Sequence, residues 1–404
     1  MRDLVILGST GSIGRQALDV LRAHAGRWRV RGLAAGRDVD GLEAQVREFH
    51  PGRVALADEA AAAELERRLA GEGVEVLAGE AGLVELAATT EADGVLSAVT
   101  GVAGLAPTLA ALKARRRVAL ANKESLVAAG PVVRRELERL YPWLAAEPGL
   151  AVHRPEAPLL PVDSEHSAIF QCLAGRGAEG QVARLILTAS GGPFRGWPRE
   201  RLAGVTVEQA LRHPTWRMGA RITVESALLM NKALEVIEAH FLFGVGYDQI
   251  EVVIHPQSIV HSLVAFVDGS VLGQLGAADM RIPIQYALTY PERWPSPAPG
   301  LDLASVGRLE FAPPDREAFP SLELGYLAGR TGGTAPAVLN AAKEEAVGRF
   351  LQGRLPFLAV PEVAGEVLAE HRAVAEPSLA DVLEADRWAR ERARRRMEAM
   401  AATW

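Results

Sequence analysis

The chain has 404 residues, of which 49% are hydrophobic and 23% charged, and its formal net charge is −6. This length exceeds what one hydrophobic core supports and predicts two or three domains, while the acidic balance disfavours nucleic acid as a partner. A single cysteine excludes an internal disulfide framework, and no apolar run is long enough to span a bilayer. Because the first apolar run starts at Leu4, we expect no signal or transit peptide and a cytoplasmic location.

The first third of the chain alternates short apolar runs with helical segments. The apolar runs lie at residues 4–7, 29–35, 53–57, 74–78, 94–99 and 117–121. Segments rich in Ala, Leu, Arg and Glu separate most of them. This alternation predicts a doubly wound parallel sheet with helices on both faces. Prolines between residues 134 and 158 indicate a helix end and a connecting loop, so we place the first domain at residues 1–150.

Three glycines, Gly8, Gly11 and Gly14, follow the first apolar run and precede a helical segment. Glycine permits a tight turn, and the free N–H groups at the start of a helix attract a pyrophosphate. The pattern therefore indicates a dinucleotide-binding loop. The alternative is a glycine-rich turn that only closes the junction between strand and helix.

The end of the second predicted strand bears on which dinucleotide binds. Gly36, Arg37 and Asp38 lie where NAD-binding proteins place a carboxylate for the ribose hydroxyl. Arg37 favours a ribose 2′-phosphate, and therefore NADPH. Asp38 opposes that choice unless its carboxylate points away from the phosphate or pairs with Arg37.

Two clusters of polar residues follow later apolar runs. Asn122, Lys123 and Glu124 come after the run at 117–121, where they could serve the nicotinamide ribose and a substrate; the alternative is a helix start capped by Asn122. Asp163 and Glu165 end a second run, and alternation along an extended segment puts both carboxylates on one side. Paired carboxylates suit Mg²⁺ or Mn²⁺, although a solvated turn is the alternative.

The middle of the chain, residues 151–293, predicts an α+β domain. Apolar runs at 185–189, 251–255, 258–267 and 270–275 read as strands, and residues 223–240 read as one helix. Ser226 falls in the first turn of that helix, where an anion is favoured. The geometry of this helix would allow a phosphate to be held by Ser226, Asn231 and Lys232. Glu235 would then be a third metal ligand. The alternative is a surface ion pair between Lys232 and Glu235.

Two loops of this middle part carry further candidate residues. Ser190 leaves a strand into the turn Gly191-Gly192-Pro193, whose N–H groups and hydroxyl could bind phosphate oxygens. The segment from His213 to Gly219 has the composition of a lid that excludes water, although a lone His or Trp more often serves packing.

The last part of the chain divides into a linker and a helical region. Residues 294–320 are rich in proline and turn residues and predict a linker. Residues 321–404 predict a small helical bundle with interruptions at Gly332-Gly333, Gly353 to Pro356, Pro361 and Pro377.

Taken in order, these motifs resemble those of the 1-deoxy-D-xylulose 5-phosphate reductoisomerase family along nearly the whole chain. The resemblance rests on the segments Gly8–Gly14, Ala121–Ser125, Pro161–His166, Ser190–Phe194, His213–Gly219, Asn231–Glu235 and His255–Ser258. It implies a Rossmann-like NADPH-binding domain, an α+β domain for catalysis and dimerisation, and a supporting C-terminal helical bundle in a homodimer.

The resemblance also implies roles for individual residues. The implied NADPH contacts are Thr10, Gly11, Ser12, Ile13, Gly36, Arg37, Asp38, Asn122, Glu124 and Gly219. The implied ligands of Mg²⁺ or Mn²⁺ are Asp163, Glu165 and Glu235. Residues implied to face the substrate sugar are Lys123, Ser164, Glu165 and His213, and those implied to hold its phosphate are Ser190, Ser226, Asn231 and Lys232. Glu235 is a further expected substrate-binding residue. Lys123 and Glu165 are the expected catalytic residues.

The expected activity is the metal-dependent rearrangement and NADPH-dependent reduction of 1-deoxy-D-xylulose 5-phosphate to 2-C-methyl-D-erythritol 4-phosphate, a step of non-mevalonate isoprenoid biosynthesis. Two alternatives remain at this stage. One is another two-domain NAD(P) oxidoreductase of the homoserine dehydrogenase type, and the other is a dinucleotide-sensing regulator without catalysis.

Overall fold

The computed structural model describes residues 1–89, 91–147, 149–150, 152–174 and 180–401. These residues form two compact units, each built from three stretches of chain. Unit 1 comprises Met1–Ser125, Arg135–Gly177 and Asp279–Gly300, and unit 2 comprises Leu126–Arg134, Ala178–Ala278 and Leu301–Trp404.

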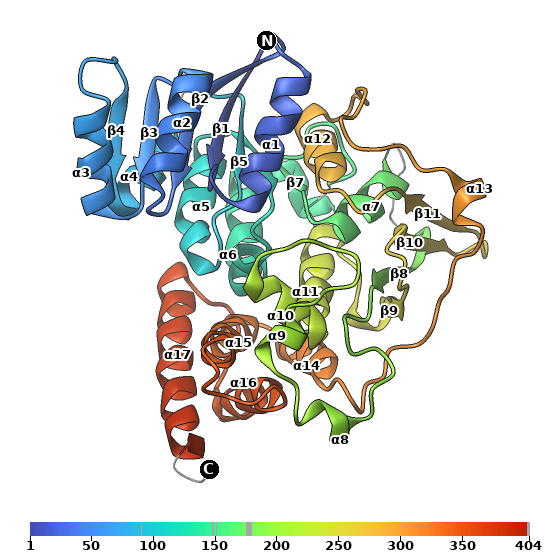
Figure 1. Ribbon diagram of the computed structural model, residues 1–404. Coiled ribbons are helices and arrows are strands. Elements are labelled where there is room, and N and C mark those ends of the chain that lie inside the picture. The colour runs from blue at the N-terminus through green and yellow to red at the C-terminus, as the bar shows by residue number, and fades with distance from the viewer. Residues whose placement is uncertain (90, 148, 151, 175–179, 402–404) are drawn as a thin grey trace. The chain divides into compact units, whose positions relative to one another are not determined.

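Unit 1 contains a seven-stranded sheet in the order β4-β3-β2-β1-β5-β6-β7, with every neighbouring pair parallel (Figure 1). The strands are β1 (Arg2–Leu7), β2 (Trp28–Ala35), β3 (Arg53–Leu56), β4 (Glu75–Ala78), β5 (Gly94–Ser97), β6 (Arg117–Leu120) and β7 (Leu159–Pro161). Leu4, Val5, Ile6 and Leu7 are all buried, as expected for a strand covered on both faces. The strand order reverses between β1 and β5, and open parallel sheets bind ligands beyond the carboxyl ends of the strands at such a point.

The helices that belong entirely to unit 1 connect these strands or follow them. They are α1 (Ser12–Ala23), α2 (Val39–Phe49), α3 (Glu59–Arg68), α4 (Gly79–Ala87), α5 (Leu105–Lys113), α7 (Ser164–Leu173) and α12 (Arg281–Thr289), with the short 3₁₀ turns η1 (Val102–Gly104) and η2 (Pro142–Ala146). The long helix α6 (Lys123–Leu140) contributes residues to both units. It is kinked at Ala129, two residues before Pro131, because proline removes a backbone donor and clashes with the preceding turn.

Unit 2 contains a four-stranded mixed sheet in the order β11-β10-β8-β9. The strands are β8 (Val182–Ala189), β9 (Ile250–Ile254), β10 (Val260–Phe266) and β11 (Val271–Leu275). β8 and β9 are parallel, whereas β10 pairs antiparallel with both β8 and β11. All four strands were predicted from their apolar runs.

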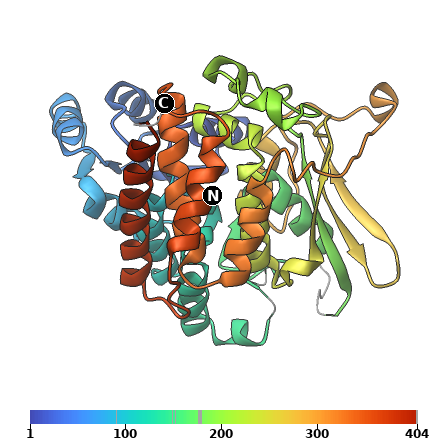
Figure 2. The ribbon, with the colours of Figure 1, turned by 90° about the horizontal axis from the view of Figure 1, so that it is seen from below.

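The helices of unit 2 fall into two sets. The first set is α8 (Arg199–Leu202), α9 (Val207–Ala210), α10 (Ala220–Ala227), α11 (Met230–Phe243), the turn η3 (Tyr247–Gln249) and α13 (Leu303–Val306). The second set, α14 (Ser321–Thr331), α15 (Ala335–Leu351), α16 (Ala359–Glu370) and α17 (Leu379–Ala401), packs side by side as the orange and red bundle of Figure 2. A buried ion pair of 2.7 Å between Lys343 and Glu225 joins α15 to α10.

The parallel sheet with its helices, the mixed sheet and the C-terminal helical part confirm the predicted fold class. The predicted domain boundaries remain a prediction. Within the part of the chain that the structure describes, no helix is both long enough and apolar enough to cross a bilayer.

Two predicted elements were wrong in detail. The helix expected over residues 223–240 is divided into α10 and α11, because Leu229 adopts a left-handed conformation with φ of 57°. Pro361 was expected to interrupt the bundle, but it lies in the first turn of α16, where a missing N–H costs no helical hydrogen bond.

Candidate active site

The glycine loop after β1 has a backbone path that side chains would block. Gly8 has φ of +83°, and a Cβ atom built on it would lie 2.5 Å from the carbonyl oxygen of Ala98, beyond β5. A Cβ atom on Gly14 would lie 2.3 Å from the carbonyl oxygen of Gly8. Glycine at both positions is therefore needed for the chain to turn tightly at the reversal point of the sheet.

This loop leads into α1 without a capping side chain. The N-cap residue is Gly11, and the first turn has no side-chain cap. Thr10 and Ile13 are half-buried, while Gly11 and Ser12 are exposed. The N–H groups of the first turn are thus available to an external anion, and the loop fits the pyrophosphate of a dinucleotide.

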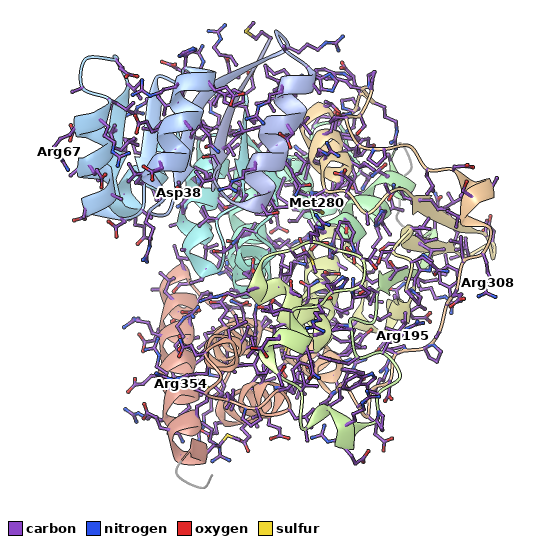
Figure 3. All side chains as sticks on the ribbon, in the orientation of Figure 1. Asp38, Arg67, Arg195, Met280, Arg308 and Arg354 are labelled. Carbon is purple, nitrogen blue, oxygen red and sulfur yellow. The ribbon has the colours of Figure 1, made fainter. Side chains whose placement is uncertain are left out.

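Asp38, labelled in Figure 3, acts as the N-cap of α2. Its carboxylate accepts a hydrogen bond of 3.0 Å from the backbone N–H of Gly41 and lies 3.8 Å from the guanidinium of Arg15. From the sequence, the Asp38 carboxylate was expected either to point away from the phosphate or to pair with Arg37. In the structure it caps the start of α2 and lies near Arg15. Arg37 and Gly36 are exposed beside it, so this part of the loop presents a cation.

Asn122 caps α6, as the structural alternative predicted. Its side-chain oxygen accepts from the N–H of Ser125 at 2.9 Å, and its amide donates to the carbonyl oxygens of Gly101, at 2.8 Å, and Val99. The amide thereby joins the loops that follow β5 and β6. Glu124 lies in the first turn of the same helix, half-buried.

Lys123 and Asp163 form a buried ion pair beyond the carboxyl ends of β6 and β7. Their side chains are 7% and 9% exposed, and the ring Nδ1 of His166 lies 3.7 Å from the other carboxylate oxygen of Asp163. Burial alone would raise the pKa of Asp163, but the Lys123 ammonium and His166 hold that pKa well below its usual range. Asp163 is therefore an anion that needs a cation beside it.

Glu165 adds a second carboxylate next to Asp163. A carboxylate oxygen of Glu165 lies within 4.8 Å of a carboxylate oxygen of Asp163. Glu165 also accepts a hydrogen bond from the Ser164 hydroxyl. The predicted reason for this proximity was wrong, because Ser164 and Glu165 belong to the first turn of α7 and only Asp163, its N-cap, precedes the helix. Two hard oxygen donors at this spacing fit a divalent cation such as Mg²⁺.

In unit 2, Asn231, Lys232 and Glu235 lie on the first turns of α11 and interact with one another. Glu235 accepts from the Asn231 amide at 2.5 Å and from the Lys232 ammonium. The predicted alternative of a surface ion pair was wrong, since Lys232 and Glu235 side chains are 4% and 1% exposed. Ser226 does not lie in a first turn; it belongs to the end of α10, because the helix breaks at Leu229.

Ser190 and His213 form a hydrogen-bonded pair whose donor and acceptor can be assigned. The Nδ1 atom of His213 accepts from the backbone N–H groups of Thr215, at 3.2 Å, and Trp216, at 2.9 Å. The ring proton is therefore on Nε2, which donates to the Ser190 hydroxyl oxygen at 3.0 Å. Burial lowers the pKa of His213, which favours this neutral form.

The hydroxyl oxygen of Ser190 also accepts from the N–H of Gly192 at 3.2 Å. Both of its acceptor positions are thus engaged, and its own proton is directed to another acceptor. The turn itself packs on α10, since a Cβ atom on Gly192 would lie 2.9 Å from the Cα atom of Ala227. The turn that carries Ser190 is therefore packed against the C-terminal end of α10, which carries Ser226.

The structure thus brings the predicted residues together in local groups. Lys123, Asp163, Ser164 and Glu165 form one group, Asn231, Lys232 and Glu235 a second, and Ser190 with His213 a third. Gly219 is the exposed N-cap of α10. The sequence interpretation assigned no role to His166, although its spacing of three residues from Asp163 at a helix start was a usable signal.

Chemically, these groups offer oxygen ligands for a cation, an ammonium group beside them, and hydroxyl, amide and ammonium donors for an anion. Together with the dinucleotide loop, they suit redox chemistry on a small anionic substrate rich in oxygen.

Three family models match the chain. The model described as 1-deoxy-D-xylulose 5-phosphate reductoisomerase matches residues 4–130. The model of its C-terminal domain matches residues 159–243, and a further DXP reductoisomerase C-terminal domain matches residues 275–392.

Relatives match over almost the entire length. The 1-deoxy-D-xylulose 5-phosphate reductoisomerase of Pelotomaculum thermopropionicum is 54% identical over 391 residues, which cover 96% of this chain and 97% of that protein. The solved Zymomonas mobilis enzyme in complex with NADPH is 40% identical, with a TM-score of 0.88 over 98% of this chain and 99% of that one. A DOX-P reductoisomerase in complex with NADPH, fosmidomycin and magnesium is 37% identical, with a TM-score of 0.91 over 99% of each chain. The chain therefore belongs to the 1-deoxy-D-xylulose 5-phosphate reductoisomerase family.

Proposed function

We propose that this chain rearranges 1-deoxy-D-xylulose 5-phosphate and reduces the product to 2-C-methyl-D-erythritol 4-phosphate, with NADPH and a divalent cation. The observation that carries the proposal is the buried Lys123–Asp163 pair beside Glu165, in a chain of this family. The homoserine dehydrogenase type and the regulator are not favoured, because neither accounts for the family match over the full length.

The glycine loop is proposed to bind NADPH through the N–H groups of Thr10 to Ile13 at the start of α1. Gly36, Arg37 and Asp38 would surround the adenosine ribose, with Arg37 as the group that attracts a 2′-phosphate. Since Asp38 is engaged with α2 and Arg15, its charge opposes that phosphate less than the sequence suggested. Asn122, Glu124 and Gly219 are the remaining proposed contacts.

Asp163, Glu165 and Glu235 are proposed to hold Mg²⁺ or Mn²⁺ through carboxylate oxygens. When bound, the ion supplies Lewis-acid polarisation of the substrate oxygens, and NADPH supplies the hydride. Two observations support this metal site: the ligands are carboxylate oxygens, and Asp163 is a buried anion. In the structure the Lys123 ammonium group compensates the charge of Asp163.

The substrate phosphate is proposed to bind Ser190, Ser226, Asn231 and Lys232. Ser190 would donate its hydroxyl proton, because His213 and Gly192 occupy its acceptor positions. The sugar would face Lys123, Ser164, Glu165, His213 and Glu235. Lys123 and Glu165 are the proposed catalytic residues: the ammonium group would donate to the reacting oxygen, and Glu165 would orient the substrate hydroxyl groups.

A homodimer in the cytoplasm is part of the same proposal, and the full-length resemblance to this family of biosynthetic enzymes supports it. The activity is tested by following NADPH absorbance with 1-deoxy-D-xylulose 5-phosphate, with and without Mg²⁺ or Mn²⁺. The variants are Glu235→Gln and, as a control, Glu200→Gln on the exposed surface of α8.

We expect oxidation that requires the metal, survives in Glu200→Gln and falls at least a hundredfold in Glu235→Gln. Equal oxidation after chelation, or none with this sugar, would contradict the proposal.

A further inference from the structure

Unit 1 contains a cavity of about 630 Å³ at the edge of the parallel sheet where the strands begin. Its lining includes Arg2, Trp28, Gly94 and Arg117, which are the first residues of β1, β2, β5 and β6. The glycine loop follows the last residue of β1, so the cavity lies at the edge opposite the proposed cofactor site. No role assigned above uses it.

Arg117 is one of three arginines that line this cavity. It donates to the carbonyl oxygens of Tyr290, at 3.2 Å, and Pro155, and no carboxylate of the described residues lies within ion-pair distance of it. Burial, and then the charge of Arg2, lower the pKa of Arg117, and the Glu156 carboxylate opposes this only in part. A half-buried guanidinium with spare N–H groups and no carboxylate in direct contact is costly, and a bound anion would reduce that cost.

Two further guanidinium groups line the same cavity. Arg2 donates to the carbonyl oxygen of Leu288 at 3.0 Å and lies 3.6 Å from the carboxylate of Glu292. Arg115 is exposed, and its guanidinium lies 5.2 Å from the centre of the Tyr141 ring. Planar guanidinium groups bind phosphate and carboxylate groups through paired hydrogen bonds.

The acidic residues of the lining are engaged elsewhere or face solvent. Asp3 lies 3.3 Å from Arg29 and 3.2 Å from Arg31, and its own N–H is bound by Asp93 at 2.8 Å. Asp93 and Glu156 are exposed. Asp3 is thus paired with arginines, whereas Arg117 has no carboxylate from the described part of the chain within ion-pair distance and, of the acidic side chains, feels only the more distant charge of the exposed Glu156.

Aromatic rings form part of the walls. Trp28, Tyr141 and Tyr290 line the cavity, and the hydroxyl of Tyr290 is already committed to the carbonyl oxygen of His153 at 2.6 Å. The volume corresponds to roughly 20 water molecules and falls in the range of pockets for organic ligands. An inorganic ion alone would leave most of it to water.

We propose that this cavity is a second ligand site of the protein, which binds a small organic oxyanion through Arg2, Arg115 and Arg117 and packs its aromatic or apolar body against Tyr141 and Trp28. The ligand class is a phosphate or carboxylate attached to a ring or chain. Its position at the opposite edge of the sheet separates it from the dinucleotide loop.

The first test is calorimetric titration of the full chain with phenyl phosphate, benzoate and inorganic phosphate. The variants are Arg117→Met and the control Arg67→Met, which removes an exposed arginine of α3 (Figure 3). Binding at the proposed substrate phosphate site is common to all three proteins, so a difference between them reports the cavity.

We expect the native chain and Arg67→Met to bind phenyl phosphate equally, and Arg117→Met to lose at least tenfold in affinity. Preference for phenyl phosphate over benzoate identifies a phosphate ligand, and the reverse preference identifies a carboxylate. Equal affinity of the native chain and Arg117→Met overturns the site. Inorganic phosphate that binds as tightly as phenyl phosphate overturns the role of the aromatic walls.

A second measurement covers the case in which Arg117→Met does not fold. The native chain is labelled with phenylglyoxal, and peptide mass spectrometry reads the modification of Arg115 and Arg67. Phenyl phosphate should slow the labelling of Arg115 at least threefold and leave Arg67 unchanged. Unchanged labelling of Arg115 overturns the proposal.

Discussion

Lys123 and Asp163 are both almost fully buried, and the ammonium group offsets much of the cost of burying the Asp163 carboxylate. Replacing Lys123 by Met keeps the length of the side chain and removes the ammonium group, so that His166 at 3.7 Å remains beside the buried Asp163 carboxylate. We expect Lys123→Met to lower the free energy of unfolding by about 3–5 kcal/mol in metal-free buffer. Added Mg²⁺ should reduce the deficit, because a bound cation would take over the compensation.

This prediction is checked by thermal melting of both proteins with EDTA and with Mg²⁺. Lys113→Met, at the exposed end of α5, is the control and should melt like the native chain. A deficit that is the same with and without Mg²⁺ would argue against Asp163 as a metal ligand.

Ser190 has its acceptor positions filled by His213 and Gly192, so its hydroxyl is available as a donor. A hydrogen bond to a charged group contributes about 1.5–3 kcal/mol, and 1.4 kcal/mol corresponds to a factor of ten. Ser190→Ala should therefore raise KM for the sugar phosphate about 10- to 100-fold with little change in kcat. Steady-state kinetics tests this, with Ser270→Ala in an exposed turn as control; a loss in kcat alone would place Ser190 elsewhere.

The identity of these residues was predictable, but their local conformation was not. Asp163 and Glu165 stand out in the sequence because two carboxylates follow an apolar run. Their proximity comes from a helix that starts at Ser164 and not from an extended strand end. The cap that Asn122 provides is local, but its amide nitrogen donates to carbonyl groups of residues 99 and 101, which no local pattern connects to it.

At the level of elements, the turn after β8 is shaped by its contact with α10. Gly192 has φ of +64°, and a Cβ atom there would lie 2.9 Å from Ala227 and 3.2 Å from the carbonyl oxygen of Ser226. Gly192→Ala should push the turn and the end of α10 apart and raise KM for the sugar phosphate several-fold, in addition to a backbone cost of about 1–2 kcal/mol.

Gly196→Ala is a matched control in the same loop, since Gly196 has φ of +77° and open space around its Cα atom. It should show the backbone cost in thermal melting and no change in KM. Equal effects of the two substitutions on KM would mean that the contact with α10 does not position Ser190.

The break between α10 and α11 shows what periodicity misses. The segment from Thr223 to His240 has no Gly or Pro, and local propensity favours one continuous helix. Leu229 nevertheless takes a left-handed conformation, held by burial of its side chain and of its neighbours Leu228 and Met230. Tertiary packing offsets the local cost, and it moves Asn231 and Lys232 into the first turn of a new helix.

For the whole molecule, buried strands and helical periodicity were sufficient to predict the parallel sheet, the α+β character of the middle part and the helical bundle, but not the strand directions of the second sheet. Long-range contacts were not predictable. Within unit 1, for example, α12 packs on α1 and α7, and Gln285 bonds His24 at 3.0 Å across 261 residues. Such pairs lie far apart in sequence and have no signature in local periodicity.

Buried and half-buried histidines give the molecule as a whole a predictable response to acid. Burial lowers the pKa of five described histidines, namely His153, His213, His240, His261 and His371. In the unfolded chain a histidine titrates near pH 6.5. Below that pH the unfolded state binds more protons than the folded state, so stability falls as pH falls until the lowered folded pKa values are reached.

The melting temperature should therefore be nearly constant above about pH 7.5 and should start to fall below about pH 6.5. A second decline should begin below about pH 4.5, because carboxylates whose pKa is lowered by arginine partners, such as Glu48 and Glu366, lose their stabilising charge there. His261→Gln should show a shallower first decline, since it removes one buried titrating ring. A melting temperature that stays level from pH 7.5 to pH 5 would mean that the buried rings are protonated as readily in the folded chain as in the unfolded one, which the loss of hydration on burial argues against.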